Sequence, residues 1–194
     1  MNESRKNSNI LNPLSYGASS SLLSNATFNR VESISNYVLK EPGSNNSNSP
    51  FNNRQSVSLG KGAGNSNQGL EAVAIGSDTG KFNQGKYSVA IGSNAAGNNQ
   101  GNNAVSMGVG AGKDFQGNQA IALGPLAGHH NQKKHSIAIG PKAAKLNQCQ
   151  NSIAIGRSAG ENQQNLQSIA IGLNSGKNQQ NQNSIAIGNQ AGET

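Results

Sequence analysis

The chain of 194 residues contains 25 glycines, no tryptophan, 32% hydrophobic and only 4% aromatic residues, too few bulky side chains for the core of a globular domain of this length. Its net charge of +7 permits an anionic partner but is equally explained by solubility. A single cysteine, Cys149, excludes an intramolecular disulfide framework.

Residues 1–55 are the first predicted region, an N-terminal arm or linker without periodicity. Ser and Asn dominate it, and the segment 43–50 (GSNNSNSP) has the composition of a flexible linker. Elsewhere in the arm, the segment 31–40 (VESISNYVLK) is compatible with a short strand or helix. We see no apolar run of the length of a signal peptide or membrane span, so we expect no membrane insertion. We expect the arm either to dock onto a larger assembly or to cap the first repeat.

Residues 56–194 are the second region and consist of nine blocks with a period of 16 residues. Each block opens with a small residue, a branched aliphatic, Ala or Ser, an aliphatic residue and Gly. The blocks begin at Ser56, Ala72, Ser88, Ala104, Ala120, Ser136, Ser152, Ser168 and Ser184. A fixed period without insertion or deletion indicates a solenoid, and it argues against the disordered Asn/Gln-rich chain that composition alone would permit.

Each repeat predicts one coil with two short strands and two turns. The alternation of small and large residues at positions 1–4 predicts a strand, and the invariant Gly at position 5 predicts a bend. Position 8 is small, and position 13 is Gln in all eight complete copies. Stacked coils would place like positions about 4.8 Å apart. The glutamines would then form a ladder of hydrogen-bonded amides, which we interpret as structural rather than as a ligand site.

The sequence leaves two arrangements of the coil open. If the small residues at positions 1, 3 and 8 fill a thin interior, the Val and Ile columns form a continuous aliphatic stripe on the outside. Such a stripe is larger than monomers usually expose, which predicts a homotrimer or a similar bundle. If the aliphatic residues fill the interior instead, a monomer becomes possible.

The repeated core, as in residues 152–156 (SIAIG) followed by Ala159 and Gly160, resembles the head repeats of trimeric autotransporter adhesins of the YadA type. The resemblance covers residues 56–194, about seven-tenths of the chain. It implies a left-handed parallel β-roll, or β-solenoid, that packs as a homotrimer around a central aliphatic interface and forms a stiff fibre for attachment. Arrays of the form NQG-x-x-S-I-A-I-G also resemble those of virion fibres and phage tail proteins.

The chain departs from the adhesin pattern in ways that guide the functional hypothesis. We see no signal peptide, coiled-coil stalk or membrane-embedded barrel, and the polar corner makes the coil longer than the usual adhesin repeat. We therefore expect a structural virion protein, a fibre or spike assembled in the host cytoplasm. It would contact capsid, tail or other virion proteins through residues 1–55 and a glycan of the host surface. A bacterial adhesin head on a cell surface and a minor capsid scaffold or cement protein are the alternatives.

Basic residues concentrate in the fifth and sixth coils and are the candidate binding site. They are His129, His130, Lys133, Lys134, His135, Lys142 and Lys145, joined by Arg157 in the next coil. We expect them to lie near one corner of the stack, where they could bind an anionic glycan, lipid head group or phosphate. A solvated turn that tolerates charge is the alternative. Nucleic acid is disfavoured because no aromatic residues are interleaved for base stacking.

We predict no catalytic, cofactor or metal site. The three histidines lack a Cys or carboxylate at a supporting spacing, and Cys149 is interpreted as incidental. Hexapeptide acyltransferases need aliphatic residues every six positions, and ice-binding solenoids need ranks of Thr; the chain follows neither rule. The expected function is therefore that of a non-enzymatic structural protein, with a polyanion-binding module as the competing hypothesis.

Overall fold

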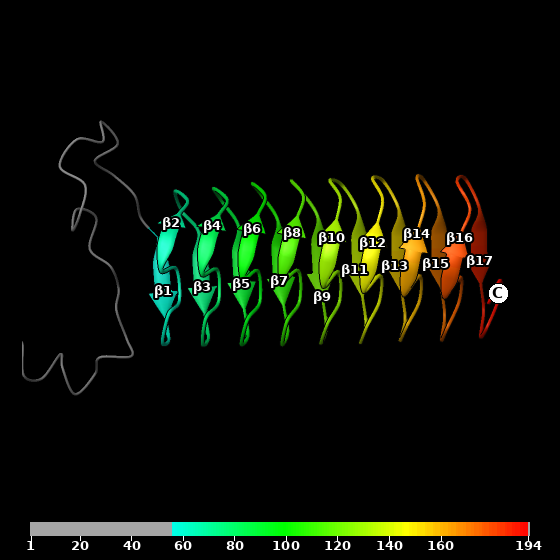
Figure 1. The fold of residues 1–194 in the computed structure, drawn as a ribbon, viewed down its shortest axis with the longest axis horizontal. Coiled ribbons are helices and arrows are strands. Elements are labelled where there is room, and N and C mark those ends of the chain that lie inside the picture. The colour runs from blue at the N-terminus through cyan, green and yellow to red at the C-terminus, as the bar shows by residue number, and fades with distance from the viewer. Residues whose placement is uncertain (1–55, 194) are drawn as a thin grey trace, which may run out of the picture. The chain divides into compact units, whose positions relative to one another are not determined.

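The computed structural model describes residues 56–193, which form a β-solenoid (Figure 1). Its regular structure consists of seventeen strands of three residues each, and this range contains no helix. The expectations for residues 1–55 lie outside the described residues.

Successive strands alternate between two sheets that face each other across the coil. The nine-stranded first sheet contains β1 (Val57–Leu59), β3 (Val73–Ile75), β5 (Val89–Ile91), β7 (Val105–Met107), β9 (Ile121–Leu123), β11 (Ile137–Ile139), β13 (Ile153–Ile155), β15 (Ile169–Ile171) and β17 (Ile185–Ile187). The eight-stranded second sheet contains β2 (Ser66–Gln68), β4 (Phe82–Gln84), β6 (Asn98–Gln100), β8 (Asp114–Gln116), β10 (His130–Gln132), β12 (Leu146–Gln148), β14 (Asn162–Gln164) and β16 (Asn178–Gln180).

The register of both sheets is parallel and shifted by one repeat at every pairing. In the first sheet Ile137 pairs with Ile121 on one side and with Ile153 on the other. In the second sheet Gln148 pairs with Gln164. Each 16-residue repeat is therefore one turn, and the described residues comprise eight complete turns followed by β17 of the ninth. The predicted all-β parallel solenoid of 16-residue coils is confirmed.

Small side chains fill the interior between the two sheets. The third repeat position is fully buried in the middle coils, as at Ala138 and Ala154, and so are the first and eighth positions, as at Ser136 and Ala143. The aliphatic residues that flank each central alanine are only partly buried, because they point to the outer face of the first sheet. Of the two arrangements open from the sequence, the first is therefore the one adopted.

The invariant glycines at position 5 set the distance between coils at the end of each first-sheet strand. Gly140 has a φ of +120°, a conformation that side chains rarely adopt. A Cβ atom added to it would lie 2.8 Å from the backbone carbon and oxygen of Gly156 in the next coil. Only glycine fits this position, as the sequence predicted for the bend.

The strands of the second sheet are unusual because their central residue is left-handed, with φ from +40° to +62° from β2 to β16. This conformation breaks the normal alternation of side chains along a strand. In β10 and β12, for example, the first two side chains face outward and the third is buried. The third residue is the invariant glutamine, which is thereby directed into the interior.

The buried glutamines form the predicted ladder. From Gln100 to Gln180, the Nε2 of each glutamine donates to the Oε1 of the glutamine in the next coil at 3.1–3.3 Å. Each Nε2 also donates across the coil, as from Gln148 to the backbone oxygen of Ile137 at 2.8 Å. The column thus ties the two sheets together and links each coil to the next, so its structural interpretation is confirmed.

Candidate functional site

The outer surface of the first sheet, which we call the aliphatic face, consists of the second and fourth residues of each repeat. Each aliphatic side chain lies directly above its counterpart in the neighbouring coil, as Val73 does on Val89 and Ile75 on Ile91. The middle coils leave these residues partly exposed, and in β17 Ile185 remains 67% exposed. Within the described residues, no other segment packs over this face. It is an apolar surface that runs along all nine strands.

The outer surface of the second sheet, which we call the amide face, consists of positions 11 and 12 of each repeat. Asn67 donates from Nδ2 to Oδ1 of Asn83 at 3.0 Å, and Asn83 donates in the same way to Asn99 at 2.9 Å. The pattern resumes between Asn131 and Asn147 at 3.1 Å. These bonds occupy one N–H and one lone pair of each inner amide, leaving the others free for solvent or a ligand.

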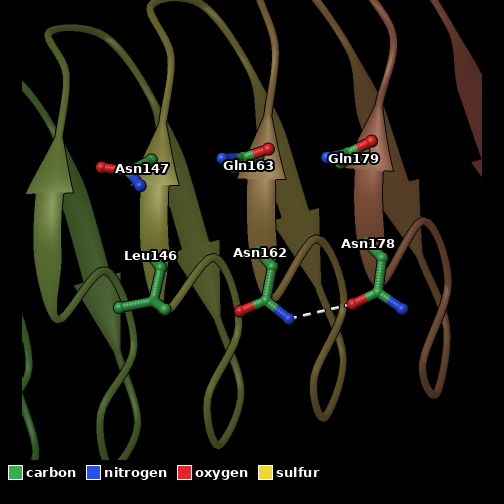
Figure 2. Close-up of a pocket in the computed structure, with 6 residues that line it drawn as sticks. All are labelled: Leu146, Asn147, Asn162, Gln163, Asn178 and Gln179. Carbon is green, nitrogen blue, oxygen red and sulfur yellow. Dashed lines mark hydrogen bonds between the residues drawn. The ribbon is translucent and has the colours of Figure 1, made fainter.

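A shallow groove of about 530 Å³ lies on the amide face over β12, β14 and β16 (Figure 2). It is lined by Leu146, Asn147, Asn162, Gln163, Asn178 and Gln179. Asn162 donates to Asn178 across it at 3.0 Å. The lining carries no charged group, so this part of the amide face can offer only neutral hydrogen bonds and contact with one leucine.

The seven basic residues expected near one corner divide between two edges of the solenoid. His129, His130, Lys142 and Lys145 lie in or beside the turns that lead into β10 and β12, which we call the first edge. Lys133, Lys134 and His135 follow β10 and form the second edge. A three-residue strand, about 10 Å long, separates the two groups, so the expectation of a single corner is wrong.

At the first edge, the two histidines differ in their surroundings. The Nδ1 of His130 lies 2.9 Å from a carboxylate oxygen of Asp114, and that carboxylate also accepts from Asn98 at 2.6 Å. His129 stacks edge-on against His130 with ring centroids 4.0 Å apart, and its buried Nδ1 has no hydrogen-bond partner. Burial, with the charges of His130 and Lys113, lowers the pKa of His129 to about 4. His129 is therefore neutral at pH 7 and adds no positive charge to this edge.

The second edge is formed by two exposed lysines and an exposed histidine. Lys133, Lys134 and His135 are all exposed, and none of them forms an ion pair within the described residues. The same turn in the preceding coil contains residues 117–119 (GNQ), and in the following coil residues 149–151 (CQN), all uncharged. The positive charge here is consequently not neutralised by neighbouring side chains. No group of three His, Cys, Asp or Glu side chains suited to a metal ion occurs between residues 56 and 193.

The central column of the amide face has one exception, to which the sequence pattern assigns no role. Position 12 is Asn or Gln in seven of the eight complete repeats and Phe115 in the remaining one. The Phe115 side chain is 58% exposed in the middle of β8. The sequence shows this interruption of the asparagine and glutamine column. In the structure, the ladder of hydrogen-bonded amides is interrupted at the same position, between Asn99 and Asn131.

The described residues form a stack of coils with an aliphatic face and an amide face. The family model described as YadA head domain repeat (2 copies) matches residues 84–96, from the end of β4 into the turn before β6. Residues 84–96 are therefore similar to the YadA head domain repeat, and the coils on either side repeat the same 16-residue pattern. No curated protein and no solved structure matches it significantly. Among the described residues, no helix is long and apolar enough to cross a membrane.

Proposed function

We propose that the chain forms a homotrimeric rod in which the aliphatic faces of three copies pack against one another. The observation that carries this proposal is the outward position of the aliphatic columns on every coil from β1 to β17. Monomeric soluble proteins seldom expose a contiguous apolar surface of this extent, and cyclic self-association would remove it from water. A three-fold assembly is proposed because the resemblance to YadA head repeats implies one.

The mass of the assembly tests this proposal. Analytical ultracentrifugation of the full chain should give about three times its mass of 19.9 kDa. Replacing Ile137 and Ile153 together by lysine places two charges on the aliphatic face and should yield a folded monomer with an unchanged circular dichroism spectrum. Asn147→Lys, on the amide face, is the matched control and should remain trimeric. A monomeric wild-type chain would refute the trimer.

The trimer would act as an attachment fibre or spike on the surface of a virion, anchored by residues 1–55 to capsid, tail or other virion proteins. The likeness of its repeats to arrays in virion fibres and the absence of the 16-residue period from residues 1–55 support this assignment. Deleting residues 1–55 should leave the rod trimeric but abolish its incorporation into purified particles, as judged by immunoblot. Incorporation of the truncated chain would contradict the anchoring role.

A second candidate function is binding of a polyanion, and the unpaired cations of the second edge favour it. Lys133 and Lys134 would supply the main attraction, with His135 beside them, and each would be repeated in the other copies of a trimer. Lys133→Ala with Lys134→Ala should lower retention on immobilised heparin, whereas Lys142→Ala with Lys145→Ala should lower it less. Equal effects of the two pairs would indicate simple net charge instead of a site.

A further inference from the structure

Phe115 is the one residue in the central column of the amide face, position 12 of the repeat, that has no side-chain amide. Three of its features should each lower the stability of the fold. Its φ of +62° is a conformation that asparagine tolerates better than a bulky side chain does. Its ring is 58% exposed to water. It also removes an amide from the column at a position where seven of the eight complete repeats carry one. A local departure of this kind without a packing benefit points to function.

Among residues 56–193, the ring of Phe115 takes part in no ring–ring or cation–π pair. The ring pair and the cation–π pair found among residues 56–193 involve His129, His130, Lys81 and Phe82, and neither includes Phe115. In the neighbouring coils, Asn99 and Asn131 occupy the same column. The ring therefore lies between two amides in the central column of the amide face.

The interruption at Phe115 leaves a donor on one side of the ring and an acceptor on the other. Asn99 accepts from Asn83 through Oδ1, while its Nδ2 has no partner in the next coil. Asn131 donates to Asn147 through Nδ2, while its Oδ1 has no partner from the preceding coil. The two free groups are two coil spacings apart, or about 10 Å. Asp114, the residue before Phe115 in β8, has its carboxylate held by Asn98 and His130.

We infer that Phe115 is the centre of a saccharide-binding platform, with Asn99 and Asn131 as its flanking hydrogen-bonding groups. A pyranose has an apolar C–H face that can lie on an aromatic ring, and a rim of hydroxyls that both donate and accept. The amide hydrogens of Asn99, the amide oxygen of Asn131 and the Asp114 carboxylate match that rim. The ligand class is a neutral hexose or N-acetylhexosamine unit of a surface glycan.

A single-stranded nucleic acid would use such a surface differently. It requires successive stacking rings and cations that follow its backbone. The central column of the amide face offers one ring from β2 to β16, and the residue before that ring in β8 is an aspartate, Asp114, not a cation. The platform deepens the proposed attachment function and rests on it, since the amide face must remain accessible in the assembly.

Glycan binding and stability measured on the same variants test the inference. The full-length chain is applied to an array of oligosaccharides ending in hexose, N-acetylhexosamine or sialic acid, with an oligothymidine as the nucleic-acid probe. Phe115→Asn restores the amide column, so it should lower binding to neutral glycans at least about tenfold. It should also raise the Tm by about 2–4 °C, which a packing role for Phe115 would not produce.

The matched control is Phe82→Asn, which removes another exposed phenylalanine of the same sheet without touching the interrupted column. It should leave glycan binding unchanged. The inference is overturned if the wild-type chain binds no glycan, if Phe115→Asn binds equally well or melts at a lower temperature, or if oligothymidine is the preferred probe. Loss of the trimer in Phe115→Asn would also overturn it, by assigning the ring to self-association. Ultracentrifugation separates this result from failure of the trimer proposal itself, which concerns the wild-type chain.

Discussion

The side-chain amide of Gln148 shows how a polar group is accommodated inside this thin solenoid. Its Nε2 donates to the backbone oxygens of Ile137 and Ser152 and to Oε1 of Gln164, while its own Oε1 accepts from Gln132. Gln148 is fully buried. Buried polar atoms are costly unless they are paired, so each of these bonds constrains the position of a neighbour.

Replacing Gln148 by leucine should therefore destabilise the fold despite similar volume. The change leaves the oxygen of Ile137 and the Nε2 of Gln132 without this partner, at a cost of about 2–4 kcal/mol. Thermal or urea denaturation followed by circular dichroism measures the effect. Gln182→Leu makes the same change at an exposed position with an ordinary φ; it serves as the control and should change stability by less than about 0.5 kcal/mol. Equal effects would show that the ladder contributes no more than its surroundings.

His129 should make the stability of the fold depend on pH. Its folded-state pKa of about 4 is below the unfolded value of 6.5, so between these values the unfolded chain binds the proton and the folded chain does not. The contribution of His129 to stability is therefore complete above pH 6.5 and is lost progressively as the pH falls towards 4. Melting temperatures between pH 4 and pH 7 should vary less in His129→Gln than in the wild-type chain; an identical pH profile would contradict this.

At the scale of the single residue, the sequence allowed the glutamine ladder to be predicted but not the role of Phe115. The glutamine recurs at every turn, and identical residues at a fixed period must stack when the turns stack. Phe115 occurs once, and its meaning depends on which groups of Asn99 and Asn131 it leaves unpaired. That information exists only in the direction of the hydrogen bonds.

Among the elements, the turn after each first-sheet strand combines a positive φ with a close approach of the next coil. Gly140→Ala combines an unfavourable φ with a Cβ clash against the backbone of Gly156, so we expect a loss of about 2–3 kcal/mol or failure to fold. Gly97→Ala is the matched control, because its φ is ordinary and the nearest atom to an added Cβ, the Cγ of Lys113, is 3.5 Å away. It should be neutral or stabilising. Comparison of their melting temperatures tests whether close backbone stacking, and not glycine content, is required.

The alternation of small and large residues predicted the strands of the first sheet but could not decide which face is inside. Alternation with a period of two defines two faces of a strand but not which of them is buried. The choice depends on the narrow space between the two sheets. That sheet was predicted only as a short second segment with a polar corner. Its left-handed central residues, such as Asn131 and Gln163, place two adjacent side chains outside and the glutamine inside. None of these central residues is a glycine, so the sequence pattern did not predict the conformation.

The division of the basic residues has a similar cause. Residues 129–135 are close in the sequence, but within a coil the chain crosses from one edge to the other in a few residues. In a stacked coil the neighbours of a residue are those 16 positions away, as Asp114 is for His130. Grouping the basic residues by their closeness along the chain was therefore wrong. Grouping them by their position within the 16-residue repeat would have predicted the two edges.

For the whole solenoid, each turn contacts only the turns beside it, so stability should depend on turn number and register. Deleting residues 136–151 removes one full turn and joins equivalent positions of the neighbouring turns. We expect this variant to fold with a modestly lower Tm. Deleting 136–150 removes one residue fewer and should disrupt the glutamine ladder and the stacking beyond it. Circular dichroism melts of the two variants provide the test, and similar melting of both would contradict a fixed register.

The side-chain ladders also have a direction. From Asn67 to Asn83, and from Gln132 to Gln148, the N–H donor always belongs to the earlier coil and the acceptor to the later one. Aligned amides polarise one another, and their dipoles add along the axis. The two ends of the described stack are consequently electrically different, one presenting side-chain acceptors and the other donors. Two such stacks brought end to end would therefore attract in one relative orientation, head to tail, and repel when like ends meet.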